Sequence, residues 1–251
     1  MTKDSIVSQL VALSNHLGDP QFDYAMLGEG NTSAKVDEET FWVKASGSSL
    51  GTLDENGLVQ IRFDRCFELL HSDDISDGAV KAGLAKAKVD SDSPSRPSTE
   101  AVLHAIALSL EGVNFVGHTH PTAINALTCS VAFEEAAKGR LFPDEIVSCG
   151  PASVIVPYTD PGLPLARKTN ELIDAFIEDY GELPKTILMQ NHGLFALGAT
   201  AHEVEAITAM AVKAARVLMG TYAFGGPHFL TPENVARIHT RPDEQYRRKQ
   251  I

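Results

Sequence analysis

The stretch NFVGHTHPTA, residues 114–123, ends an apolar run with two histidines that stand one residue apart. It is rich in β-forming residues and Pro121 interrupts it, which predicts a strand that stops just beyond the histidines. Because side chains alternate between the two faces of a strand, we expect His118 and His120 on one face and Thr119 on the other. The two imidazole rings can then converge on one point.

A third histidine, His192, stands in the segment MQNHGLF at the exit of another predicted strand. Three neutral imidazoles that leave an open position for a substrate are typical of a catalytic zinc site. His118, His120 and His192 are therefore candidate ligands of one divalent metal ion. The alternative is three ordinary histidines that are satisfied by hydrogen bonds or by solvent. The other histidines lack comparable surroundings and are predicted to be structural: His16, His71, His104, His202, His228 and His239.

Around this stretch, helical and β-rich segments follow one another along the chain. Apolar residues at helical spacing predict helices at residues 5–17, 98–110, 122–130, 130–139, 163–181 and 200–220. β-rich segments predict strands at residues 31–36, 40–46, 57–63, 66–70, 112–118, 152–158 and 185–193. Residues 71–97 are rich in Asp, Ser, Lys, Gly and Pro, which predicts a long surface loop.

Composition narrows the class of protein. The chain has 251 residues, 43% of them hydrophobic, which is enough for one large domain with a substantial core. A formal net charge of -12 is the wrong sign for a general nucleic-acid surface, although backbone amides can still bind a phosphate locally. The N-terminal MTKDSIVSQL does not resemble a signal peptide and no segment is long and apolar enough for a membrane span. We therefore expect a cytoplasmic protein without membrane or nucleic-acid partners.

The cysteines are too widely separated for a disulfide framework or a cysteine metal site. Cys66, Cys129 and Cys149 form no CxxC motif. We expect three buried free thiols.

Three segments have the composition of anion-binding loops. GEGNTS (residues 28–33) and KASGSSL (residues 44–50) set glycine beside small polar side chains. PSTEA (residues 97–101) precedes a predicted helix, whose N-terminal amides favour a negative charge. Each segment alone is also what an ordinary turn or a helix cap looks like.

Taken in order, five segments resemble the class II aldolase/adducin family, which includes fuculose-phosphate and rhamnulose-phosphate aldolases and ribulose-phosphate 4-epimerase. They are GEGNTSAK, VKASGSSL, RPSTEAVLHA, GHTHPTAINALT and MQNHGLFALGATAHEVEAI. The resemblance runs from about Leu10 to Met219. It implies an α/β fold with three α/β/α layers around a central, mostly antiparallel sheet. We expect residues 1–251 to form a single domain of this type, with a C-terminal tail from about residue 224.

The resemblance also implies roles for particular residues. The metal ligands fall on His118, His120 and His192, and the acid/base carboxylate falls on Glu100. The phosphate-binding positions fall on Asn31, Ser46, Gly47, Ser98 and Thr99. The implied cofactor is one divalent metal ion per chain, with Zn²⁺ favoured by the imidazole ligands and Mn²⁺, Co²⁺ or Fe²⁺ as alternatives.

The function implied is that of a metal-dependent aldolase. Such an enzyme would cleave a ketose 1-phosphate, or a related phosphorylated hydroxy-ketone, to dihydroxyacetone phosphate and an aldehyde through an enediolate whose charge the metal stabilises. The resemblance further implies a homotetramer with active sites between subunits, and a tyrosine as second proton donor. Tyr222 and Tyr246 are candidates by position alone.

Three alternatives stay open at the level of sequence. One is a metal-dependent decarboxylase of a keto or aromatic acid, and another is a sugar-phosphate 4-epimerase. No counterpart of the epimerase's additional catalytic acid is evident after HTHP. The third is a non-enzymatic interaction module like the adducin head, which the intact set of three histidines and one glutamate disfavours.

Overall fold

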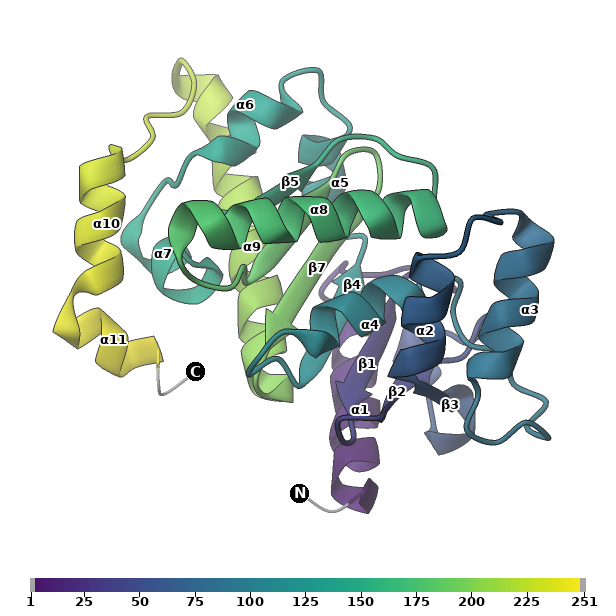
Figure 1. Cartoon of the computed structure of the whole chain (residues 1–251). Coiled ribbons are helices and arrows are strands. Elements are labelled where there is room, and N and C mark those ends of the chain that lie inside the picture. Colours follow the sequence, from purple (N-terminus) through teal and green to yellow (C-terminus); the bar gives the residue numbers. More distant parts are fainter. Residues whose placement is uncertain (1–2, 249–251) are drawn as a thin grey trace.

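A seven-stranded sheet with helices on both faces forms the centre of the molecule, as a computed structural model of residues 3–248 shows (Figure 1). The strand order is β3-β2-β1-β4-β7-β6-β5, and every neighbouring pair is antiparallel except β5 with β6. The predicted layered α/β fold with a mostly antiparallel sheet is thus confirmed. The strands are β1 (Asn31–Lys35), β2 (Thr40–Lys44), β3 (Leu58–Arg62), β4 (Phe115–Thr119), β5 (Val154–Val156), β6 (Thr186–Met189) and β7 (Gly193–Gly198).

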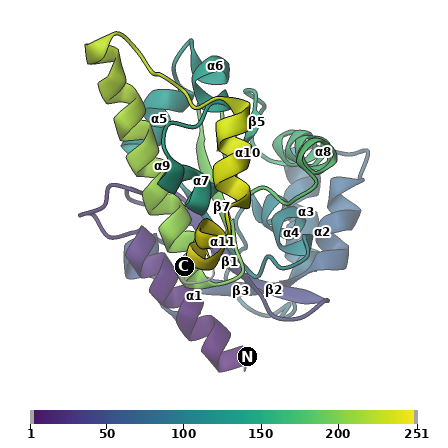
Figure 2. The ribbon, with the colours of Figure 1, turned by 90° about the vertical axis from the view of Figure 1, so that its left-hand side faces the viewer.

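Helices pack on the sheet in two layers, which Figure 2 shows on opposite sides of the strands. Each layer shares one of the two hydrophobic clusters with the sheet residues that face it. One layer contains α2 (Phe63–Leu70), α3 (Asp77–Ala87), α4 (Ala101–Ser109) and α8 (Leu163–Tyr180). The other contains α1 (Lys3–Leu17), α5 (Thr122–Thr128), α6 (Phe133–Lys138), α7 (Pro143–Cys149) and α9 (Ala201–Thr221).

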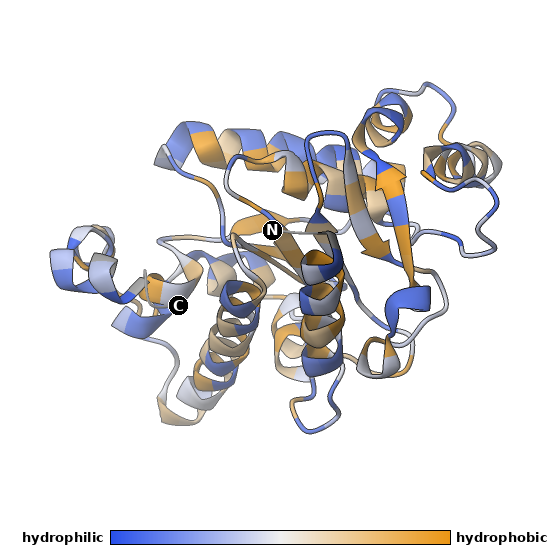
Figure 3. Cartoon of the chain, turned by 90° about the horizontal axis from the view of Figure 1, so that it is seen from below, coloured by the Kyte–Doolittle hydropathy of each residue, from blue (hydrophilic) through white to orange (hydrophobic). Residues whose placement is uncertain are grey.

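Short 3₁₀ turns and the C-terminal tail complete the chain. The turns are η1 (Leu50–Thr52), η2 (Glu55–Gly57) and η3 (Tyr222–Phe224). The tail forms α10 (Pro232–Thr240) and α11 (Pro242–Arg248), which both pack on α7. Figure 3 shows these tail helices as largely hydrophilic, whereas hydrophobic residues line the strands and the helix sides that face them. Among residues 3–248, no helix combines the length and the apolar character that crossing a bilayer would require.

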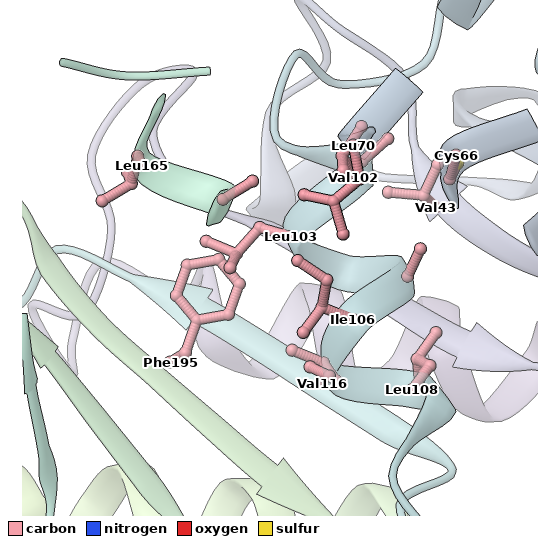
Figure 4. Close-up of a cluster of buried hydrophobic side chains, with 14 of the residues drawn as sticks. Val43, Cys66, Leu70, Val102, Leu103, Ile106, Leu108, Val116, Leu165 and Phe195 are labelled. Carbon is pink, nitrogen blue, oxygen red and sulfur yellow. The ribbon is translucent and has the colours of Figure 1, made fainter. Parts of the chain in front are cut away.

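Helix α4 lies at the centre of its layer and is buried on all sides. All its residues from Ala101 to Leu108 are buried. Figure 4 shows Leu103 and Ile106 of this helix packed beside Phe195 and Val116 of the sheet. A helix that is apolar all round is stable only inside a core, and this burial fixes where α4 begins relative to the sheet. The residue before it, Glu100, is thereby held at the sheet edge.

The elements of the predicted site meet at one edge of the sheet. β4 and β6 are both antiparallel to β7, and β5 is parallel to β6, so all three strands end at this edge. β1 begins and β2 ends there, because Asn31 pairs with His118 and Ser33 pairs with Val43. An isolated bridge between Ala45 and Pro97 joins two of the predicted anion-binding loops.

The structure corrects two predicted segments in the first half of the chain. CFELL, predicted as a strand at 66–70, is the second half of helix α2. The buried residues Phe63, Cys66 and Leu70 of this helix follow the helical spacing i, i+3 and i+7. The pattern becomes visible only when the segment is taken to begin at Phe63. The predicted loop 71–97 contains helix α3, which Ser76 caps by accepting a hydrogen bond from the Ala79 backbone N–H.

Three further differences concern the second half of the chain. Strand β7 and helix α7 are not among the predicted elements, and the tail contains two helices. Residues of β7 are buried on both faces, so the strand lacks the polar alternation that marks a half-exposed strand.

Cys66 and Cys149 are buried free thiols as predicted, but Cys129 is exposed because it caps the end of α5 at the surface.

We predict that Gly30→Ala destabilises the protein. Gly30 has a φ of 68°, and an added Cβ would lie 2.5 Å from the carbonyl oxygen of His118. The free energy of unfolding should fall by about 1–3 kcal/mol, as measured by urea unfolding. Gly220→Ala is the matched control, because an added Cβ at that helical position would meet no atom within 4 Å apart from the backbone of its own helix and its two chain neighbours. This variant should be as stable as the wild type or slightly more stable. Equal stability of the two variants would contradict the close approach of Gly30 to β4.

Candidate metal centre

Three histidine rings from two strand ends face one another at the sheet edge. His118 lies in β4, His120 follows that strand, and His192 lies in the turn between β6 and β7. Ring centroids are 4.7 Å apart for His118 and His120, 4.9 Å for His118 and His192, and 5.1 Å for His120 and His192. One nitrogen of each ring lies within 4.8 Å of those of the other two. The structure therefore brings together three residues, distant in sequence, that could hold one metal ion.

The ring orientation of His118 suits a metal ligand. Its Nδ1–H donates a hydrogen bond to the backbone carbonyl oxygen of Leu194 at 3.0 Å. A neutral imidazole carries one N–H, so this bond leaves the Nε2 atom of His118 with a free lone pair. That atom faces Nε2 of His120 at 2.9 Å. An outer ring nitrogen bonded to a carbonyl and an inner one turned to the cluster are typical of metal-binding histidines. Three imidazoles that face one point are a ligand set that fits a divalent ion.

Burial favours the neutral form of two rings of this cluster. It lowers the pKa of His118 well below its usual value and also lowers the pKa of His120, although Glu100 opposes both effects. The ring of Phe195 stacks on His118 with centroids 4.2 Å apart and excludes water from that side. Neutral imidazole is the form that binds a metal ion, so the protein presents these two ligands in the required state near neutral pH.

A carboxylate lies directly beside the cluster. Glu100 precedes α4, with Oε1 at 3.1 Å from Nε2 of His192 and Oε2 at 3.4 Å from Nε2 of His118. The side-chain amide of Asn31 donates to Oε2 at 2.7 Å. Burial alone would raise the pKa of Glu100, but the hydrogen bonds that the carboxylate accepts from His192 and Asn31 oppose this and hold the pKa below its usual value. Glu100 is therefore an anionic base next to the candidate metal position.

The predicted phosphate-binding residues come from neighbouring loops but differ in exposure. Asn31 and Ser98 are buried and in contact, because the Asn31 amide also donates to Ser98 Oγ at 3.3 Å. Ser46, Gly47 and Thr99 are exposed. Gly47 has a φ of 86°, a left-handed conformation that glycine adopts without strain. The exposed residues are available to a ligand. The side-chain amide of Asn31, in contrast, already donates its hydrogen bonds to Glu100 and Ser98.

Two charged side chains of this edge are not among the predicted site residues. Glu29 has Oε1 at 4.0 Å from Nδ1 of His120. Lys44 is buried, its ammonium group donates to the backbone carbonyl of Ser48, and burial lowers its pKa. Both lie inside the glycine-containing segments that the sequence marks as anion-binding loops. Their position within those segments is the one feature of the sequence that could have marked these two residues as part of the site.

Comparison with known sequences gives a family that covers most of the chain, and the similar proteins include one that is much longer than this chain. The family described as "Class II Aldolase and Adducin N-terminal domain" matches residues 8–219. The uncharacterized oxidoreductase YuxG of Bacillus subtilis (strain 168) is 33% identical over 202 residues, which are 77% of this chain and 27% of that protein. The chain thus spans little more than a quarter of the length of this curated relative.

Solved structures give the same fold. The N-terminal class II aldolase domain of a conserved protein from Thermoplasma acidophilum is 29% identical, with a TM-score of 0.68 over 87% of this chain and 96% of that one. An L-fuculose 1-phosphate aldolase is 16% identical, with a TM-score of 0.72 over 98% of both chains. At the lower identity the likeness is to the fold alone.

We predict that the protein binds one transition-metal ion per chain and that His118→Ala abolishes tight binding. Loss of a residue that only supports a ligand weakens metal binding about 10–100-fold, so loss of the ligand itself should weaken it more than about 100-fold. Competition with a chelator, combined with elemental analysis, measures both quantities. His202→Ala is the control, because the His202 side chain is 71% exposed and lies beside Glu205 of the same helix instead of in the cluster. A His118→Ala variant that retains its metal would contradict the assignment.

We also predict that His104 makes folding stability depend on pH. Burial lowers its pKa from 6.5 to about 4. Between these values the unfolded chain binds more protons than the folded chain, so the free energy of unfolding falls as the pH falls. The loss due to His104 should reach about 2 kcal/mol on going from about pH 7 to about pH 5.

Urea unfolding at these two pH values tests the prediction. His104→Gln should show the smaller pH dependence, since glutamine does not titrate, whereas the exposed control His202→Gln should behave like the wild type. Equal pH dependence in wild type and His104→Gln would contradict it.

Proposed function

The chain belongs to the class II aldolase and adducin family, and from this premise we propose that it is a metal-dependent lyase that cleaves a ketose 1-phosphate or a related phosphorylated hydroxy-ketone. The proposed products are dihydroxyacetone phosphate and an aldehyde. One observation carries the proposal. A carboxylate, Glu100, lies 3.1 and 3.4 Å from ring nitrogens of a three-histidine cluster that could hold a metal ion.

Each proposed residue has a task in breaking a carbon–carbon bond next to a ketone. His118, His120 and His192 would hold the metal ion, which when bound supplies a Lewis acid for the negative charge that develops on substrate oxygens. Cleavage removes a proton from the substrate hydroxyl that becomes the aldehyde and adds one to the carbon atom that keeps the bonding electrons. Glu100, as a carboxylate, would take up a proton from solvent and deliver it to that carbon, while the hydroxyl proton is released to solvent.

The loops around the cluster would hold the phosphate group. Ser46, Gly47 and Thr99 are exposed at the same edge, and the Ala45–Pro97 bridge keeps their loops together. We propose that these residues, with Ser98, bind the phosphate. Asn31 would contribute mainly by holding Glu100, since its amide donates to that carboxylate at 2.7 Å.

Further parts of the proposal concern the ion, the assembly and the location. Zn²⁺ is proposed because imidazole ligands suit it, with Mn²⁺, Co²⁺ and Fe²⁺ as alternatives. We also propose a homotetramer. Exposed apolar side chains that follow α9, among them Tyr222 and Phe224, support a subunit contact there, and Phe224 is 92% exposed. A cytoplasmic location stays a prediction from the sequence.

We predict that Glu100→Gln lowers kcat by about 10²–10⁴-fold without loss of the metal ion, because glutamine cannot accept a proton. The substrate is first found by screening ketose 1-phosphates, their unphosphorylated forms and keto acids, with and without EDTA. Separate detection of dihydroxyacetone phosphate, aldehyde and carbon dioxide distinguishes cleavage of a sugar from decarboxylation. Substrate epimerisation is followed by chromatography.

Glu38→Gln is the matched control, because the Glu38 side chain is 89% exposed and pairs with Lys35 away from the cluster. The proposal predicts cleavage that stops with EDTA and depends on the phosphate group. Release of carbon dioxide in place of aldehyde, or turnover that survives both EDTA and Glu100→Gln, would contradict it.

A further inference from the structure

A chain of buried hydrogen bonds leads from the sheet interior to Glu100. Ser33 Oγ lies 2.6 Å from Nδ1 of His104, and Nε2 of His104 is hydrogen-bonded to Oδ1 of Asn31. The Nδ2 atom of Asn31 donates to Glu100 Oε2 at 2.7 Å and to Ser98 Oγ at 3.3 Å. Ser33 and His104 are fully buried, and Asn31 is nearly so. The sequence separations are large, because His104 is 71 residues from Ser33 and 73 from Asn31.

The chemistry of the groups fixes the direction of every bond in this chain. An ionised carboxylate only accepts hydrogen bonds, so Asn31 must present its NH₂ group to Glu100 and its oxygen to His104. That oxygen needs a donor, which is the Nε2–H of His104. A neutral imidazole has only one N–H, so Nδ1 is an acceptor and the hydroxyl of Ser33 donates to it. Each donor in the series therefore points toward Glu100.

The surroundings hold His104 in this neutral form and keep it apart from the metal position. The ring of Phe195 contacts both His104 and His118, with its centroid 5.2 Å from that of His104 and 4.2 Å from that of His118. His104 also sits on α4, one turn after Glu100, so a single rigid helix carries both residues. Buried imidazole with both nitrogens bonded has little freedom to rotate.

We propose that His104 is a positioning residue, which locks the side-chain amide of Asn31 with its NH₂ group toward Glu100 and so keeps the carboxylate aimed at the histidine cluster. Without the Nε2–H donor, the oxygen of the Asn31 amide would lose its partner, and the amide would be held only at its NH₂ end. The amide could then rotate out of line, and Glu100 would lose its fixed position. The functional part of this inference rests on the acid/base role proposed for Glu100.

The first test needs no substrate. In full-length protein labelled with ¹⁵N-histidine, NMR should show His104 with a protonated Nε2 and an unprotonated Nδ1, and the signals are assigned by their loss in His104→Gln. This state should persist as the pH falls through the usual titration range of histidine. A protonated Nδ1, or protonation of both nitrogens near neutral pH, would overturn the proposal.

The second test separates positioning from packing. His104→Leu should lower kcat about 10–100-fold while KM changes less than about 3-fold, because displacement of a catalytic group acts on the chemical step. His104→Gln should recover most of kcat, since its amide can donate to Asn31. Equal losses of kcat in the Leu and Gln variants, or none in either, would overturn the proposal.

Ser33→Ala and Ser14→Ala form the matched pair for this test. Both remove a buried hydroxyl next to β1, but Ser14 bonds to Thr32 on the opposite face of the sheet, where it has no link to His104. Only Ser33→Ala should lower kcat. If no substrate is turned over, the proposed function fails while the NMR result still decides the hydrogen-bond direction.

Discussion

The register between β1 and β4 is the constraint on which the candidate site depends. Asn31 pairs with His118, and His118 pairs with Phe195 of β7, so one row of three side chains crosses the sheet on the face that α4 covers. Because side chains alternate, a slip of one residue would send Asn31 and Ser33 to the face of α1 and α9. The hydrophobic pattern prevents such a slip, since Ala34 lies in the opposite core. Packing of an apolar core thereby fixes a polar contact.

The clustering of the three candidate ligand histidines could be predicted from the sequence because their placement follows local rules. Period-two alternation puts His118 and His120 on one face, and a strand exit places His192 at an edge. The helices with clear apolar stripes, such as α1 and α8, follow from spacing alone. Where spacing is obscured, prediction fails. The strand β7 is buried on both faces, and α3 is rich in small residues, so its stability comes from the Ser76 cap and from contact with α2.

The hydrogen-bond chain behind Glu100 could not be predicted in this way. It requires β1 to pair with β4 and α4 to dock on both, and neither fact is local in sequence. A histidine such as His104, in the middle of an apolar helix, looks like any satisfied core histidine. Glu29 and Lys44 lie in segments with an evident anion-binding composition, yet only the folded chain shows which of their side chains turn toward the cluster and which turn inward.

The candidate site has a rigid part, formed by strands and a buried helix, and an exposed part, formed by loops. We expect the exposed part to determine substrate selectivity. His118, Asn31 and His104 lie on strands and on a buried helix, where rotamers are fixed by packing. Beyond them lie exposed loop side chains, among them Leu27, which is 91% exposed with a φ of 52°, and Tyr158 after β5. Loops change more easily than core strands, and sites built this way keep one reactive centre while the surrounding surface selects the substrate. Under the proposed function, proton transfer would depend on residues of the sheet and α4, whereas the choice of aldehyde would depend on the loops.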